Sequence, residues 1–169
     1  MDDSQKAING TRQAFPAAES SVVQRQRLPG APICECEAVA RLSAPASGSI
    51  EFATLEPAAK SPAFTQVVRV SSDRVVLTGL QMGFRETEAD VKLAFDRIGK
   101  ALESQKASFS DVVMISNYPL SRSIIDKMRA VRFSYLDQSK PPASTLVLFE
   151  GLPSVDASFG MDVIAALKN

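Results

Sequence analysis

The sequence predicts an α+β fold in which a mixed β-sheet carries two helices on one of its faces. Two observations predict it. From residue 50 onward, β-rich runs flank two segments with helical periodicity, and a strand-like run separates these two segments. Each helical segment gathers its apolar residues on one side, so each helix has a single face to bury against the sheet. The opposite face of the sheet then lacks a cover, and we expect copies of the chain to associate through it.

The first part of the predicted sheet is a short strand followed by a hairpin. The strand covers residues 50–54. The runs FTQVVRV at residues 64–70 and RVVLTGL at residues 74–80 are rich in β-branched residues, and the polar triplet SSD lies between them. Because serine and aspartate favour tight turns, we expect the two runs to pair with each other.

The first helix is predicted over residues 87–105. Thr87 is a suitable N-cap residue, and Asp90 stands three residues later, as in an imperfect capping box. Four apolar residues recur at helical spacing and predict the buried stripe of this helix: Val91, Phe95, Ile98 and Leu102.

The second helix is predicted over residues 121–136. Pro119 ends the strand before it, and either Ser121 or Ser123 caps it. Three further strands are predicted at residues 110–118, 145–149 and 159–166.

The composition narrows the chemistry that the chain can perform. It has 169 residues, no histidine, and 19 basic residues against 19 acidic ones. Without histidine, Ser-His-Asp and Cys-His catalysis and histidine-containing metal sites are excluded. The balanced, interleaved charges argue against a nucleic-acid or membrane partner, which requires clustered positive charge. No apolar run is long enough to cross a bilayer.

The two cysteines, Cys34 and Cys36, indicate a reducing compartment, and we expect a cytoplasmic protein. They alternate with Glu35 and Glu37 in a predicted strand, so both thiols share one face. Two thiolates are too few to hold a metal ion, and we interpret them as small apolar residues. No metal or cofactor is expected.

The beginning of the chain resembles its end. At an offset of 124 residues, the segment SSVV at residues 20–23 aligns with STLV at residues 144–147, and both copies continue to a Leu-Pro pair. We interpret this as a weak internal repeat. Residues 1–48 then hold a partial copy and a linker, and residues 49–169 hold a complete domain. Chance similarity is the alternative, because strand-turn-strand sequences are common.

Five short motifs follow one another along the chain, namely FTQVVRV from Phe64, VLTG from Val76, DVV from Asp111, Pro142-Ala143 and Leu152-Pro153. In order and spacing they resemble the landmarks of the Rid family, also called YjgF/UK114. The resemblance covers residues 50–169, with residues 18–40 as a partial second copy. It implies a chorismate-mutase-like fold and a homotrimer that is packed sheet-inward, with clefts between subunits.

The resemblance also implies a hydrolase. Active members of the family hydrolyse enamine and imine intermediates of amino acid metabolism and release ammonia, without a metal or an organic cofactor. The implied partner is therefore a small metabolite that bears a carboxylate. This deaminase chemistry suits a chain without histidine.

The residues that the family uses for this reaction are largely replaced. The family holds the substrate carboxylate with an arginine in a Pro-Ala-Arg-Ser stretch, because a guanidinium offers two parallel donors. Ser144 stands in that place here, and Gly160 stands where the family has its water-activating glutamate. A family asparagine on the second helix becomes Lys127, and a tyrosine before the first hairpin becomes Phe64.

Two acidic residues are candidates for catalysis. Glu35, in the partial copy, would activate water as a general base. Asp162, two residues after Gly160, would act as a displaced acid. A solvent-facing position in a strand is the alternative for Glu35, and a structural role near the strand edge is the alternative for Asp162.

Five residues are candidates for ligand binding: Phe64, Gly79, Lys127, Ser144 and Thr145. The two hydroxyl groups would hold a carboxylate, the lysine would neutralise it, and Gly79 would offer its amide from the wall of a cleft. The alternatives are ordinary strand hydroxyls, a surface lysine, and a glycine that permits close backbone approach. Arg69 and Arg74 would either replace the missing arginine or remain solvated charges.

Two functions remain open on this basis. In the first, the protein is a Rid-family binder of a small carboxylate-bearing metabolite at intersubunit clefts, with enamine/imine deaminase activity in question. In the second, it is a non-enzymatic assembly or regulatory module. Ribonuclease activity, which is attached to some family members, is disfavoured because the chain is neutral and lacks a basic patch.

Overall fold

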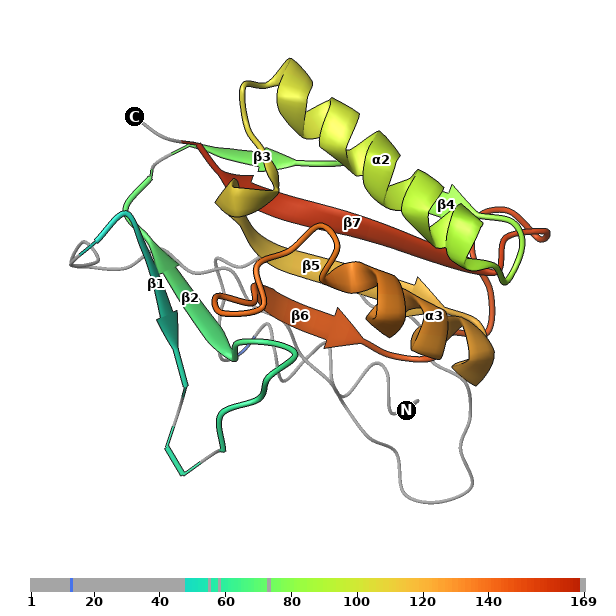
Figure 1. The fold of residues 1–169 in the computed structure, drawn as a ribbon, viewed down its shortest axis with the longest axis horizontal. Coiled ribbons are helices and arrows are strands. Elements are labelled where there is room, and N and C mark those ends of the chain that lie inside the picture. The colour runs from blue at the N-terminus through green and yellow to red at the C-terminus, as the bar shows by residue number, and fades with distance from the viewer. Residues whose placement is uncertain (1–12, 14–47, 55, 58, 73, 168–169) are drawn as a thin grey trace. The chain divides into compact units, whose positions relative to one another are not determined.

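A computed structural model describes residues 13, 48–54, 56–57, 59–72 and 74–167 (Figure 1). The chain divides into two compact units, Met1–Ala40 and Arg41–Asn169, and the elements named here belong to the second. They are, in chain order, β1 (Ile50–Ala53), β2 (Val67–Val70), β3 (Val75–Leu77), β4 (Gln81–Gly83), α2 (Glu88–Ser104), the 3-10 helix η1 (Phe109–Asp111), β5 (Val112–Pro119), α3 (Arg122–Arg132), β6 (Ala143–Leu146) and β7 (Phe159–Ala166).

The main sheet has five strands, with β3, β7, β5 and β6 in that spatial order and β4 also paired with β7. The strand β7 runs antiparallel to β3, β4 and β5, whereas β5 and β6 are parallel, so the sheet is mixed. A register shift between Val112 and Met114 marks a bulge in β5. Both helices cover one face of this sheet (Figure 1), which confirms the predicted α+β fold.

The core lies between the helices and that face of the sheet. Alternate residues of β7 point into it, and Phe159, Met161, Val163 and Ala165 are at most 1% exposed. From α2, Val91, Phe95, Ile98 and Leu102 are buried to the same degree, so the predicted apolar stripe is confirmed.

Hydrogen bonds at the helix N-termini explain where the helices begin. The Oγ1 atom of Thr87 accepts a hydrogen bond from the Asp90 amide at 3.2 Å, which confirms the predicted cap of α2. Ser121 caps α3 in the same way, through the Ile124 amide at 3.2 Å. The end of α3 is earlier than predicted, at Arg132, because the chain turns there. Leu136 nevertheless remains in the core at 4% exposure.

The predicted hairpin between residues 64–70 and 74–80 is wrong. Instead, β2 pairs with β1, and β3 pairs with β7. Ser71 donates its amide to the Ser49 carbonyl and its hydroxyl to the Gly48 carbonyl, which extends the β1–β2 pairing. The Ser72 hydroxyl accepts a hydrogen bond from the Arg74 amide and donates one to the Arg74 carbonyl, and β2 and β3 belong to different sheets.

The strand predicted at residues 145–149 is displaced toward the N-terminus, to Ala143–Leu146. Parallel pairing with β5 sets its position, because Met114 faces Ala143 and Asn117 faces Leu146. Beyond this register the chain leaves the strand, and the Phe149 amide donates to the Pro119 carbonyl at 3.0 Å.

Three aromatic rings join α2 to η1 and to the segment after α3. The Phe95 and Tyr135 rings stack with their centroids 4.7 Å apart, and the Phe109 ring meets Tyr135 edge-on at 5.4 Å. The Tyr135 hydroxyl donates to Asp96 at 2.8 Å. Burial and this hydrogen bond raise the pKa of Tyr135 to about 12. The ring therefore stays neutral under physiological conditions.

Gly83 provides a test of the packing between β4 and β7. A Cβ atom at this position would lie 2.1 Å from the ring of Phe159, which is fully buried and has no room to move. We expect Gly83→Ala to lower the free energy of unfolding by about 1–3 kcal/mol, as overpacking does. Gly151→Ala is the control, because open space surrounds Gly151. Urea denaturation measures both; equal stability of the two variants would contradict the packing described.

Candidate functional site

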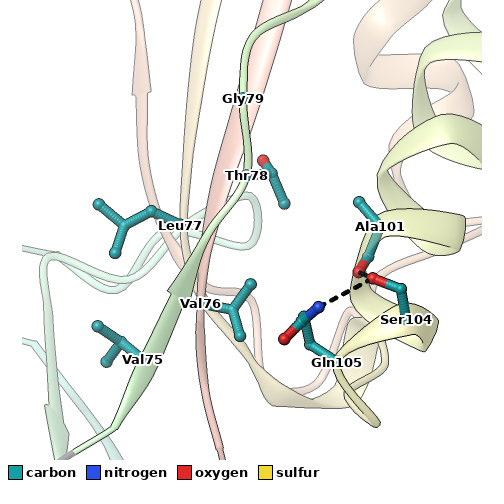
Figure 2. A pocket seen from close by; sticks show the side chains of 8 residues that line it. All are labelled: Val75, Val76, Leu77, Thr78, Gly79, Ala101, Ser104 and Gln105. Carbon is teal, nitrogen blue, oxygen red and sulfur yellow. Dashed lines mark hydrogen bonds between the residues drawn. The ribbon is translucent and has the colours of Figure 1, made fainter.

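A shallow pocket of about 390 Å³ lies between β3 and the C-terminal end of α2. Figure 2 shows Val76 directed toward the helix, whereas Val75 and Leu77 point away from it. Ala101, Ser104 and Gln105 form the helix side, and Gln105 donates to the Ser104 hydroxyl at 3.2 Å. None of the residues that line the pocket is ionisable, so it offers no acid or base for catalysis.

Gly79, a predicted ligand-binding residue, lies at one end of this pocket. The alternative interpretation, that it permits close backbone approach, is wrong, because nothing lies within 4 Å of the position a Cβ would take. The close approaches occur at two other glycines of the sheet: Gly83 meets Phe159, and Gly160 meets Leu80.

The sheet separates the remaining candidates into two groups. Ser116 of β5 faces Thr145 on one side and Asp162 on the other, so these three residues form one row across β6, β5 and β7. Their neighbours Ile115 and Val163 point into the core, so the row lies on the face opposite the helices. Asp162 and Thr145 thus share a face, but Ser144, which alternates with Thr145, points the other way.

On the helix side, Ser144 belongs to a small polar cluster with Asn117 and Arg132. The Ser144 hydroxyl accepts from Asn117 Nδ2 at 3.3 Å and from Arg132 Nη1 at 3.3 Å. Asn117 also donates to the Thr145 carbonyl at 2.9 Å, which fixes its amide beside β6. The cluster therefore joins the last residue of α3 to two parallel strands of the sheet.

Arg132 is the unusual member of this cluster. The residue is only 8% exposed, and its Nε and Nη2 atoms are buried without a hydrogen-bond partner among the described residues. Burial lowers the pKa of its guanidinium from 12.5 to about 10, so the group keeps its positive charge near neutral pH. Its charge lies beside the serine that replaces the arginine of the Rid-family pattern.

Arg132 was not predicted as a site residue, although the sequence of α3 contains a signal for it. Ile124, Met128 and Arg132 are four residues apart, so they share one face of α3, and the first two are buried in the core. A positive charge that continues an apolar stripe is uncommon and marks a residue with a specific partner.

The other ligand-binding candidates lie apart from this cluster. Lys127 donates to the Ser123 hydroxyl at 2.7 Å within α3. Phe64 is 40% exposed and precedes Thr65, which bridges to Ala143 at the start of β6. Arg69 lies 3.4 Å from Glu51 across the β1–β2 pair and so is not a spare cation. Glu35 lies outside the described residues.

Among the described side chains, no group of three or more histidine, cysteine, aspartate or glutamate residues could hold a metal ion. In the same part of the chain, no helix is both long enough and apolar enough to cross a bilayer.

Solved structures with the same fold come from the family that the five motifs resemble. A Rid-family protein of unknown function from Yersinia pestis, YyfB, is 17% identical with a TM-score of 0.60; the match covers 70% of this chain and 99% of that one. RidA from an Antarctic Psychrobacter is 24% identical with a TM-score of 0.51, covering 66% and 93%. Rv2704 of the YjgF/YER057c/UK114 family, from Mycobacterium tuberculosis, is 21% identical with a TM-score of 0.50, covering 61% and 86%.

These structural similarities establish the fold. No curated protein matches the chain significantly. The family model described as Endoribonuclease L-PSP, however, matches residues 54–167, which is most of the chain. The chain therefore belongs to the Endoribonuclease L-PSP family, also known as the YjgF or Rid family.

Proposed function

We propose that this protein binds a small carboxylate-bearing metabolite in clefts between the subunits of a cytoplasmic homotrimer. The observation that carries the proposal is the polar cluster at Ser144. Where the family pattern has a carboxylate-binding arginine, this chain has a hydroxyl that accepts hydrogen bonds from a buried guanidinium and an amide. The positive charge is thus retained at this position but comes from α3.

The proposed association uses the sheet face opposite the helices, and in the proposal the clefts open at the edge strand β6, which carries Ser144. Val75 and Leu77 lie on that face and are 45% and 68% exposed. Ile164, the β7 partner of Leu77, and Met114, the β5 partner of Ile164, extend this apolar strip and are half-buried. An exposed apolar strip on a sheet is stabilised when a second copy covers it. In the proposed assembly, residues 1–48 form a partial copy of the domain that residues 49–169 form completely.

The trimer is tested by sedimentation velocity of the full chain. We expect a trimer for the wild type and a shift toward monomer for Leu77→Glu, because a buried unpaired carboxylate opposes association. Val155→Glu is the matched control, since Val155 is 98% exposed in a loop and its replacement adds the same charge. A monomeric wild type, or equal shifts in both variants, would contradict association through this face.

Ligand binding is tested by calorimetry with 2-oxo acids such as pyruvate and 2-oxobutanoate. We expect saturable binding to the wild type and a loss of about 2- to 10-fold in affinity for Ser144→Ala, the range for one neutral hydrogen bond. Ser154→Ala, in the loop between β6 and β7, is the control and should bind as the wild type does. Binding by neither the wild type nor the control would remove the basis of the proposal.

A second candidate function is imine hydrolysis, in which water adds to the C=N carbon and ammonia leaves as the carbonyl forms. The row of Ser116, Thr145 and Asp162 favours it, because it places one carboxylate next to two hydroxyl groups on the face assigned to association. In this scheme Asp162 takes a proton from the water, as a general base does.

Ammonia release from freshly generated 2-aminoacrylate distinguishes the two functions. If Asp162 acts as a base, Asp162→Asn lowers the rate above buffer by about 100-fold or more, the usual contribution of a general base. Asp156→Asn, in the exposed loop before β7, is the control. A wild-type rate equal to that of buffer rejects hydrolysis and leaves the binding function in place.

A further inference from the structure

We propose that Arg132 binds the carboxylate group of the ligand through its two unpaired donors, Nε and Nη2. This inference rests on the proposed function, to which it adds the residue and the binding mode. In a guanidinium, Nε and Nη2 lie on one edge and direct two parallel N–H bonds the same way. That edge matches the two oxygen atoms of one carboxylate.

One nitrogen of the Arg132 guanidinium bonds to the protein, and the other two form the edge that has no partner among the described residues. The third nitrogen, Nη1, donates to the Ser144 hydroxyl at 3.3 Å. The Arg132 group also lies 5.6 Å from the centroid of the Phe133 ring, which restrains its position. The side chain is thus held at one end by β6 and by its neighbouring ring, while the carboxylate-binding edge has no partner among the described residues.

Asp90, another buried charged side chain of the described region, shows what a purely structural role looks like. Asp90 is 7% exposed, its carboxylate accepts a hydrogen bond from the Thr87 hydroxyl, and it lies 3.4 Å from Arg85. Arg132 has neither an acidic neighbour within salt-bridge distance in this part of the chain nor a full set of acceptors. An unpaired buried charge is costly, so a ligand anion would relieve it.

The position of β6 gives the ligand a route. This strand is the edge of the five-stranded sheet, and all four of its residues are half-buried. Its outer side meets only the bridge from Thr65 to Ala143 among the strands described. Ser144, on this edge strand, is the residue through which β6 contacts the guanidinium. Formate and acetate are the smallest probes of such a site.

The test compares Arg132→Met and Arg132→Lys with the matched control Arg129→Met. Arg129 lies on the same helix with its side chain 66% exposed, so its replacement removes the same charge from a solvated position. Formate and pyruvate are titrated against each full-length protein by calorimetry, and the ¹⁵N signal of the Arg132 Nε–H group is followed by NMR. We expect the wild type and Arg129→Met to bind both probes and Arg132→Met to bind them about 10- to 100-fold more weakly, as the loss of charged hydrogen bonds predicts.

The urea midpoint of Arg132→Met is a second readout. A purely structural role of Arg132 predicts a lower midpoint for this variant than for the wild type. If Arg132 serves the ligand, Arg132→Met unfolds in urea at no lower concentration than the wild type without formate, because the variant no longer buries an unpaired charge. Added formate then raises the midpoint of the wild type and leaves that of Arg132→Met unchanged. Arg132→Lys should recover binding only in part, since lysine offers no parallel pair of donors.

The outcomes separate this inference from the proposed function. Pyruvate binding that survives in Arg132→Met overturns the inference and leaves the proposed function standing. Formate binding and an Nε–H shift in a wild type that binds no 2-oxo acid support the inference and reject the proposed function. A wild type that binds neither probe overturns both. Marked loss of stability in Arg132→Met without formate would make Arg132 a structural residue.

Discussion

The pairing of β7 with three other strands is the constraint on which the rest of the structure depends. Every second residue of this strand points into the core, where Phe159, Met161 and Val163 are almost completely buried. The register with β5 then fixes which side chains lie on the opposite face, and Asp162 is placed beside Ser116 by this register alone. A shift of one residue would exchange the two sets, which would bury a carboxylate and expose the core. The position of every candidate on the sheet follows from this alternation.

Patterns that are local in sequence were sufficient to predict α2. The periodicity and the cap of α2 depend on neighbours within a few residues, and both were predicted from Thr87 and its apolar stripe. Pairing partners are not local. The β-rich run at residues 64–70 was predicted correctly as strand-forming, but its partner is β1 and not the run that follows it. The choice depends on hydrogen bonds from Ser71 to Gly48 and Ser49, over 20 residues away, which no short window contains.

The candidate site shows the same division. Family resemblance identified Ser144 as a replaced position, and the structure shows what surrounds it. The guanidinium that reaches this position belongs to Arg132, at the end of α3. An arginine side chain is long, so its charged group can lie far from its own backbone, and the sequence alone does not show which residue it contacts. Asp162 and Ser144 were predicted together as site residues, whereas strand alternation places them on opposite sides of one sheet. The two side chains therefore do not lie in one site of a single protomer. A site that uses both would have to include both faces of the sheet.

The two-stranded ribbon of β1 and β2 has a consequence for local stability. Its strands pair with each other and not with the main sheet, and the bridge from Thr65 to Ala143 is the backbone link that the described strands show between ribbon and sheet. Isolated two-stranded ribbons are marginally stable in water. The ribbon amides should therefore exchange with solvent deuterium long before those of β5 and β7, through an opening that leaves the core intact. Since that bridge ends at the residue next to Ser144, each such excursion would also uncover the sheet edge beside the polar cluster.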